Sequence, residues 1–305
     1  MKSYNNFTYA YKELMYDLKE HGIENTVRNM RVKELLNYSF TITNPRDRLL
    51  NIPERNTIMR RYIFGELLWY LSGSDKLSSI VKYSKFWKNI SDDGYHSNSA
   101  YGKYIFGSME RKGDGVNYKL EHPGYFNQWD WCKKLLTDDC NTREAVINIK
   151  PIQMYETKDV VCTIALNFYI RDNKLHLTTY MRSNDAVKGL TYDVFMFTFL
   201  QELMAKELNV ELGTYNHVVT NLHIYERDWQ LIDTVINNRD NSVLLLAPIE
   251  EDFRKVELPL LLRYEAFGFT GIELTEIEKL STLSWQLMSF LEDSNYVREK
   301  IQERL

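Results

Sequence analysis

Residues Met181–Val194 read MRSNDAVKGLTYDV and connect a strand-like segment, LHLTTY, to an apolar helix pattern. Such a run of polar side chains does not suit a hydrophobic core, and the helix that follows needs only one capping residue. Arg182 and Ser183 offer donors suited to a phosphate group. The structural alternatives are a solvated strand end for this pair and a helix cap for Asp193. The stretch predicts a strand, a polar binding loop and a helix in direct succession.

Patterns on either side of this stretch predict both helices and strands. The expected helices are Tyr9–His21, Thr57–Ser72, Trp129–Thr137 and Asp193–Leu208, and the expected strands are 40–45, 145–149, 160–170, 175–180 and 216–225. Asp172 and Asn173 predict a turn between two of the strands. With only six prolines, no low-complexity linker and no repeat, we expect one α+β domain over residues 1–305, with a mixed sheet packed by long helices.

The composition excludes several classes of protein. A formal net charge of −4 argues against a general nucleic-acid binder, which needs a basic face. Three cysteines without CxxC spacing predict neither disulfides nor a structural metal site, as expected in a reducing cytoplasm. The N-terminus lacks the apolar core of a signal peptide, and we find no window suited to a membrane span. We therefore expect a cytoplasmic protein that binds neither membranes nor metal.

Three further features are unusual for their apolar surroundings. Glu66 lies within YIFGELLWYL, where a carboxylate is part of a site, part of a structural ion pair, or on a helix face that emerges into solvent. Cys162 begins CTIALNFYI, where it is either a small core residue or a nucleophile activated by arginines. His223 and Tyr225 alternate in NLHIYER and therefore share one face of a strand, which is also consistent with an ordinary half-buried sheet.

Taken in order, six segments resemble the thymidylate synthase family. They span roughly residues 60–228 and read GELLWYLSG, NSAYGKYIFG, TREAVINI, VVCTIALNFYIRDNKL, YMRSNDAVKGLTYDV and NLHIY. The resemblance implies a thymidylate synthase-like fold and a homodimer with the sheet at its interface. It also implies a pyrimidine nucleoside monophosphate as substrate and 5,10-methylenetetrahydrofolate as co-substrate.

The resemblance also implies a role for individual residues. Cys162 matches the family nucleophile, Glu66 the glutamate of water and proton transfer, and Tyr101 the active-site tyrosine. The residues matched to nucleotide binding are Arg182, Ser183, His223 and Tyr225, together with Arg28 and, from a partner subunit, Arg143. Trp87 and Asp185 match residues near the folate, and Gly189 lies in the loop under the base.

The departures from the family pattern point to a particular branch. Thr163 stands where thymidylate synthases usually have a histidine, and Glu144 replaces a second partner-subunit arginine. Asp193 stands at the base-reading position in place of asparagine. The chain ends in NYVREKIQERL, without the short apolar tail that closes over folate. These features resemble the phage dCMP hydroxymethylases and the related CMP hydroxymethylases of nucleoside-antibiotic pathways.

The exchange at Asp193 predicts a cytosine base. Uracil presents an N3–H donor beside the O4 acceptor, which an amide complements. Cytosine protonated at N3 presents two donors, which a carboxylate accepts. We therefore expect a cytidylate 5-hydroxymethyltransferase that uses dCMP or CMP. The alternatives are a thymidylate synthase, a cytidylate C5-methyltransferase and a non-catalytic nucleotide-binding protein.

Overall fold

The computed structural model describes residues 2–51, 56–107, 127–152, 155–240, 245–292 and 294–304. Within these ranges one mixed sheet runs in the order β1-β3-β8-β6-β5-β4, with β2 paired to β3 and β7 paired to β8. The central strands β6 and β8 are parallel, whereas β3–β8 and β5–β6 are antiparallel. The strands are β1 Lys2–Tyr4, β2 Ile23–Val27, β3 Met30–Ile42, β4 Val146–Asn148, β5 Thr163–Arg171, β6 Lys174–Met181, β7 Asn184–Asp185 and β8 Glu211–Tyr225.

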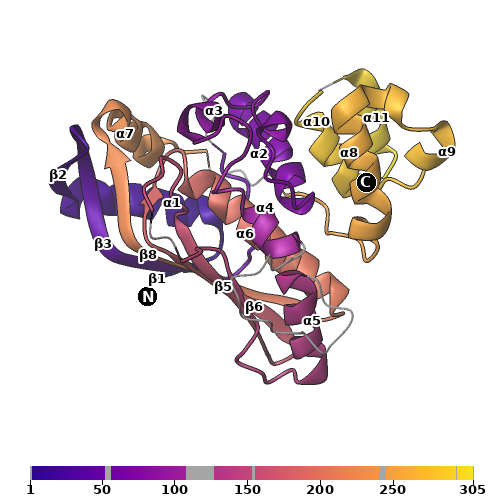
Figure 1. The fold of residues 1–305 in the computed structure, drawn as a ribbon, viewed down its shortest axis with the longest axis horizontal. Helices are drawn as coiled ribbons and strands as arrows, with labels where there is room; N and C mark the ends of the chain where they lie inside the picture. Colours follow the sequence, from indigo (N-terminus) through magenta and orange to yellow (C-terminus); the bar gives the residue numbers. More distant parts are fainter. Residues whose placement is uncertain are drawn as a thin grey trace.

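Helices pack on the sheet and on one another. The helices are α1 Phe7–His21, α2 Asn56–Leu71, α3 Phe86–Ile90, α4 Tyr101–Phe106, α5 Gln128–Asp138, α6 Leu190–Glu207, α7 Gln230–Asn237, α8 Leu258–Phe267, α9 Leu274–Ile277, α10 Thr282–Ser289 and α11 Asn295–Gln302. Helix α6 contacts both β6 and β8, and nearly all of its residues are buried. Helix α2 contacts α6, and the C-terminal helix α8 lies beside α2 (Figure 1). The predicted mixture of a sheet and long buried helices is therefore confirmed.

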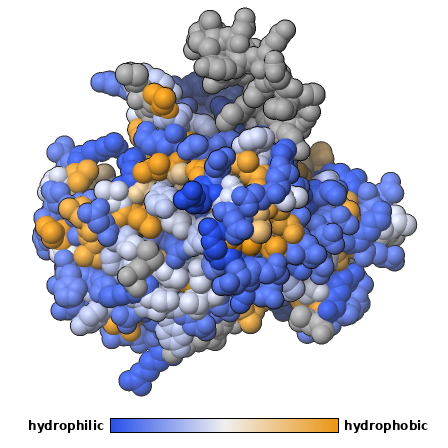
Figure 2. All heavy atoms as spheres, turned by 90° about the horizontal axis from the view of Figure 1, so that it is seen from below, coloured by the Kyte–Doolittle hydropathy of each residue, from blue (hydrophilic) through white to orange (hydrophobic). Residues whose placement is uncertain are grey.

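The two faces of the sheet differ in chemistry. Leu166, Phe168 and Leu177 alternate toward the core, as the strand period of two requires. On the other face, the Asn216 amide donates to the Tyr169 hydroxyl at 3.2 Å, and neighbouring polar side chains continue this network. The view from below shows hydrophobic residues in several separate patches among hydrophilic ones (Figure 2). The predicted role of the sheet in a dimer stays a prediction, as does the single domain over residues 1–305.

Most expected elements are present, with shifted boundaries. The turn at Asp172 and Asn173 is confirmed, because both residues have φ values near +55°, at 52° and 58°. The expected helix from Thr57 ends as predicted before Gly73, whose φ is +66°. Helix α6 begins three residues earlier than expected, at Leu190, because Gly189 is the residue before it. The sequence reading placed Cys162 inside a strand, whereas β5 begins one residue later.

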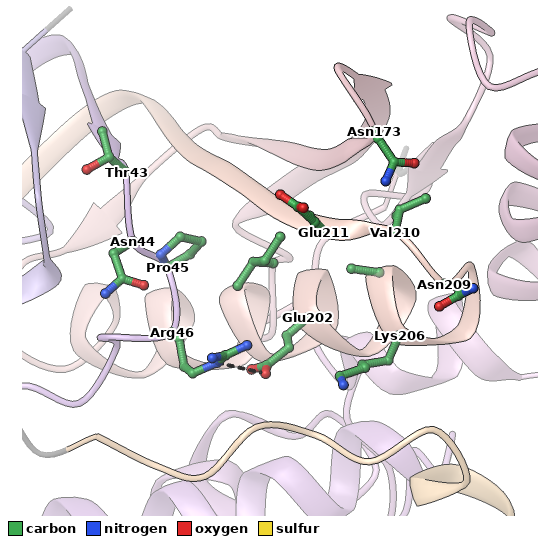
Figure 3. A pocket seen from close by; sticks show the side chains of 12 residues that line it. Thr43, Asn44, Pro45, Arg46, Asn173, Glu202, Lys206, Asn209, Val210 and Glu211 are labelled. Atoms are coloured by element: carbon green, nitrogen blue, oxygen red, sulfur yellow. Dashed lines mark hydrogen bonds and ion pairs between the residues drawn. The ribbon is translucent and has the colours of Figure 1, made fainter.

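A pocket of about 620 Å³ lies where the turn after β3 meets the C-terminal end of α6 and the β5–β6 turn (Figure 3). Its lining shares no residue with the predicted site. Glu202 accepts a hydrogen bond from Nε of Arg46 at 3.0 Å and is also paired with the buried Arg48. With the charge of Glu202 compensated by two arginines, this pocket belongs to the framework that attaches α6 to the β3 turn.

None of the described helices has the length and apolar character that crossing a membrane would require. All three cysteines are free in the structure.

Candidate active site

The half-buried thiol of Cys162 lies directly beside the guanidinium group of Arg182. Nη2 of Arg182 is 3.4 Å from Sγ, and the Arg182 backbone N–H donates to the Cys162 carbonyl at 3.0 Å. Nε and Nη2 of Arg182 also donate to the carbonyls of Val161 and Val160, each at 2.9 Å. These contacts use one edge of the guanidinium and leave Nη1 without a partner among the described residues. The prediction that an arginine lies near Cys162 is confirmed, and Nη1 remains available to an anion.

A side chain from helix α4 holds the backbone at Cys162. The Tyr101 hydroxyl oxygen, at the start of α4, accepts the N–H groups of Cys162 and Thr163 at 3.3 and 3.2 Å. Because Cys162 precedes β5, these N–H groups would otherwise require other partners. Tyr101 is itself buried and stacks on Phe197 of α6, with 6.4 Å between ring centroids. Tyr101, matched to the active-site tyrosine of the family, therefore contacts the backbone of Cys162 directly.

The electrostatics of Cys162 combine opposing effects. The sequence predicts arginines that lower the pKa of Cys162, and the charges of Arg182 and Arg28 both act in this direction. Burial raises the pKa of the thiol, and Asp193 and Asp159 raise it further. Burial outweighs the two arginines, so the net shift of the Cys162 pKa is upward.

Glu66 occupies the buried side of α2, one turn after Tyr62. The Tyr62 hydroxyl donates to Oε1 of Glu66 at 2.9 Å, and Nε1 of Trp87 donates to the Tyr62 oxygen, also at 2.9 Å. Oε2 of Glu66 is buried and has no hydrogen-bond partner in the described part of the chain. Burial disfavours the charged form of a carboxyl group that has no cation beside it, and here it raises the pKa of Glu66 to about 8. Of the alternatives for Glu66, the solvent-facing helix position is wrong, because Glu66 is buried, and Glu66 forms no ion pair with any of the described residues.

Asp193 is the fourth residue of α6 and does not cap the helix. The residue before the helix is Gly189, and no side chain forms a cap hydrogen bond there. Burial raises the pKa of Asp193 to about 7, and a hydrogen bond from Asn184 partly opposes this rise. Asp193 and Glu66 lie close enough for the charge of one to raise the pKa of the other. The capping explanation for Asp193 is excluded, and two carboxyl groups share one buried region.

These raised pKa values predict a pH dependence of stability. Glu66 has a pKa near 4.5 when exposed and about 8 in the folded chain, so the folded state binds more protons between these values. Stability contributed by protonated Glu66 is therefore present at low pH and lost as the pH rises toward 8. We expect Glu66→Gln, which keeps an acceptor for Tyr62, to gain about 2–4 kcal/mol relative to the parent between pH 5 and 9. Urea unfolding at each pH measures this difference, and parallel curves would contradict it.

The loop Asn184–Gly189 brings further predicted residues beside β8. Asp185 pairs with His223 across the β7–β8 ladder, and the His223 and Tyr225 rings lie 5.1 Å apart. Oδ1 of Asp185 accepts the N–H of Val187 at 2.8 Å, a contact that stabilises the loop. The shared strand face of His223 and Tyr225 is confirmed.

Gly189 is required for close packing in the same loop. An added Cβ would lie 2.4 Å from Oδ1 of Asn184 and 3.1 Å from the Asp185 carbonyl oxygen. Any side chain at this position would therefore displace the amide of Asn184, which contacts Asp193.

The remaining predicted residues lie at different distances from this cluster. Arg28 has a φ of 50° in the β2–β3 turn, and its charge lowers the pKa values of both Cys162 and Tyr225. Trp87 contacts Tyr62, and Ser183 is half-buried next to Arg182. Arg143 is exposed in the loop before β4 and makes no recorded contact with the cluster. A single chain therefore brings together every predicted residue except Arg143.

The sequence reading missed three polar residues of the cluster. Tyr62 lies four residues before Glu66, a helical spacing that could have indicated it. Nδ2 of Asn184 lies 3.3 Å from Nε2 of His217, and both side chains are buried. His217 also contacts the Tyr215 hydroxyl at 2.8 Å, and burial lowers its pKa to about 3, which keeps the ring neutral. No sequence motif distinguishes His217 from an ordinary strand residue.

The arrangement has the components of covalent catalysis on a small anionic substrate. A thiol, a guanidinium edge and two protonatable carboxyl groups converge on the ends of β5, β6 and α6.

Known proteins share this sequence pattern. The thymidylate synthase family model matches residues 9–268. The chain is 29% identical to a deoxyuridylate hydroxymethyltransferase of Bacillus phage SP01 over 82% of this chain and 66% of that protein. It is 26% identical to a deoxycytidylate 5-hydroxymethyltransferase of Enterobacteria phage T2 over 60% of this chain and 74% of that protein. It is 25% identical to a thymidylate synthase of Haloferax volcanii over 53% of this chain and 50% of that protein. The match therefore spans 66% of the length of the phage SP01 protein and 50% of the length of the Haloferax volcanii protein. Because the family model covers most of the sequence, the chain belongs to the thymidylate synthase family.

Proposed function

We propose that the protein is a cytidylate 5-hydroxymethyltransferase, which transfers a one-carbon unit from 5,10-methylenetetrahydrofolate to C5 of dCMP or CMP. The observation that carries this proposal is Asp193, a half-buried carboxyl group that neither caps α6 nor forms an ion pair among the described residues. The phage relatives support hydroxymethyl transfer by their names, although those names differ in the base.

The chemistry of the base edge favours cytosine. With a pKa of about 7, Asp193 can carry a proton at neutral pH. Cytosine N3 is a basic ring nitrogen, so it can take this proton and then face the carboxylate with two donors, N3–H and the 4-amino group. Uracil O4 is a weakly basic carbonyl oxygen, and an ionised Asp193 would repel it. The raised pKa therefore supplies the proton that the cytosine reading needs.

Each remaining residue has a role in this proposal. Cys162 adds to C6 of the pyrimidine, and Tyr101 holds its backbone. Arg182, Ser183 and Arg28 bind the phosphate, while His223 and Tyr225 bind the sugar hydroxyl. Trp87, Asp185 and Gly189 form the folate side, where methylenetetrahydrofolate supplies the one-carbon unit. Glu66 then takes a proton from the water that adds to the one-carbon unit and completes the hydroxymethyl group.

We further propose a homodimer, because Arg143 lies outside the cluster of its own chain and suits a phosphate ligand of a second copy. Sedimentation of the protein, combined with nucleotide binding by Arg143→Ala, tests this. A monomer with unchanged nucleotide affinity would contradict it. The three free cysteines suit a cytoplasmic location.

Product analysis tests the proposed activity. We expect dCMP or CMP to give a product heavier by one hydroxymethyl group, with no dihydrofolate absorbance, when each nucleotide is incubated with methylenetetrahydrofolate. Thymidylate from dUMP with dihydrofolate would instead identify a thymidylate synthase, and a 5-methylcytidylate with dihydrofolate a methyltransferase. Tritium release from 5-tritiated cytidylate separates an enzyme from a nucleotide-binding protein, because binding alone does not break the C5–H bond.

A further inference from the structure

Three side chains form a hydrogen-bonded chain that ends on Glu66. Trp87 in α3 donates to the hydroxyl of Tyr62, and Tyr62 donates to Oε1 of Glu66, each at 2.9 Å. Tyr62 is further fixed by the ring of Tyr192, whose centroid lies 4.5 Å away. The arrangement connects α2, α3 and the first turn of α6.

The chemistry of the donors fixes the direction of this chain. An indole N–H can only donate, so the Tyr62 oxygen must accept from Trp87. The Tyr62 proton then has Glu66 Oε1 as its acceptor, and turning it away would leave a buried hydroxyl unpaired at a cost of about 1–3 kcal/mol. Burial keeps Tyr62 protonated, since it raises the phenol pKa well above 10. Oε1 of Glu66 is therefore an acceptor, and the proton of a neutral Glu66 must be on Oε2.

We propose that Tyr62 is a positioning residue that confines the catalytic proton of Glu66 to Oε2, the oxygen that has no hydrogen-bond partner among the described residues. This rests on the proposed function of the same site. When Glu66 acts as an acid, the Oε2–H bond breaks, the proton passes to the bound nucleotide or its water, and the Tyr62 O–H stabilises the carboxylate at Oε1. When water adds to the one-carbon unit, its O–H bond breaks and Oε2 takes the proton back.

The groups around Glu66 agree with a proton held there. The charge of Asp193, in α6, raises the pKa of Glu66, and the charges of both carboxyl groups raise the pKa of Tyr70 in α2. Burial is the main cause of the raised Glu66 pKa of about 8, while the Tyr62 hydrogen bond lowers it. Removing the Tyr62 hydroxyl should therefore raise the Glu66 pKa further.

Tyr62→Phe tests the proposal, with Tyr264→Phe as its matched control. Tyr264 also donates a buried hydroxyl to a glutamate, Glu292, at 3.1 Å, but it belongs to the C-terminal helices. We expect Tyr62→Phe to lower kcat about 10-fold or more while the KM for the nucleotide changes less than twofold. The alkaline decline of kcat that belongs to Glu66, near pH 8, should move up by about one pH unit, because a hydrogen bond to the charged form is lost, whereas the decline assigned to Asp193 should stay in place. The control should change neither. An unchanged kcat and pH profile in Tyr62→Phe would overturn the proposal.

A second measurement separates this inference from the proposed function. If the parent protein converts no pyrimidine nucleotide, the function fails, and the pH dependence of urea unfolding decides the role of Tyr62. The upper end of the pH range over which stability declines should move upward in Tyr62→Phe, because it is set by the folded-state pKa of Glu66. Glu66→Gln lacks this decline, and adding Tyr62→Phe to it should leave the pH dependence unchanged. A range that stays the same in the single variant would reject the role of Tyr62.

Discussion

Cys162→Ala is expected to abolish product formation and any covalent nucleotide adduct, with a loss of at least about 10⁴-fold in turnover. Sγ is the nucleophile in the proposed reaction, and no second cysteine can replace it, because Cys132 is fully buried and Cys140 is exposed elsewhere on the surface. The half-buried position suggests that alanine is tolerated by the fold. Turnover and the mass of the denatured enzyme–nucleotide complex measure the effect.

Cys140→Ala is the matched control for this change. It removes an exposed thiol outside the cluster and should retain both turnover and the adduct. An adduct that persists in Cys162→Ala would reject the nucleophile assignment. Because burial raises the thiol pKa, we also expect the parent protein to react slowly with thiol reagents at neutral pH, in spite of the neighbouring Arg182.

Asp193→Asn is expected to change the base preference from cytidylate toward uridylate by about 10³-fold or more in the ratio of kcat/KM values. The amide complements uracil and leaves the protonated N3 edge of cytosine facing a donor, and a mismatched buried hydrogen bond gives discrimination of this size. The measurement is kcat/KM for dCMP, CMP and dUMP in the parent and the variant. An unchanged ratio would contradict the role of Asp193.

The same variant should also change the pH profile. With the Asp193 pKa at about 7, cytidylate turnover by the parent should decline as the pH rises past this value, because the proton needed at N3 is lost. The decline due to this group should be absent in Asp193→Asn. Asp138→Asn, at the exposed end of α5, is the control and should leave both the ratio and the profile unchanged.

Elements with strong local patterns could be predicted from the sequence. The apolar faces of α1, α2 and α6 and the turn at Asp172 are local signals, and all of these elements are present. Most of β3 was missed, because the expected strand 40–45 includes only its last three residues. The pairing of β3 with β8 is a long-range property that a local pattern does not show. The C-terminal helices were missed because they carry no recognised motif.

The candidate site was predicted as residues but not as an electrostatic environment. Order along the chain indicated Cys162, Arg182 and Asp193, which the fold brings close to one another. The protonation of these groups depends on burial, which a sequence does not specify residue by residue. For this reason the sequence predicted the arginines that lower the pKa of the thiol but not the larger opposing effect of burial, and the contribution of Tyr62 to Glu66 was missed.

The hydrogen bonds to the Tyr101 oxygen determine which ligand atoms its hydroxyl group can bind. Two successive backbone N–H groups already occupy the lone pairs of its oxygen. Only its own hydrogen is left to offer, and that hydrogen is polarised by the two donors behind it. A ligand atom that approaches Tyr101 must therefore be electron-rich, so this phenol distinguishes carbonyl-like groups from amino groups on any ring held over the sulfur.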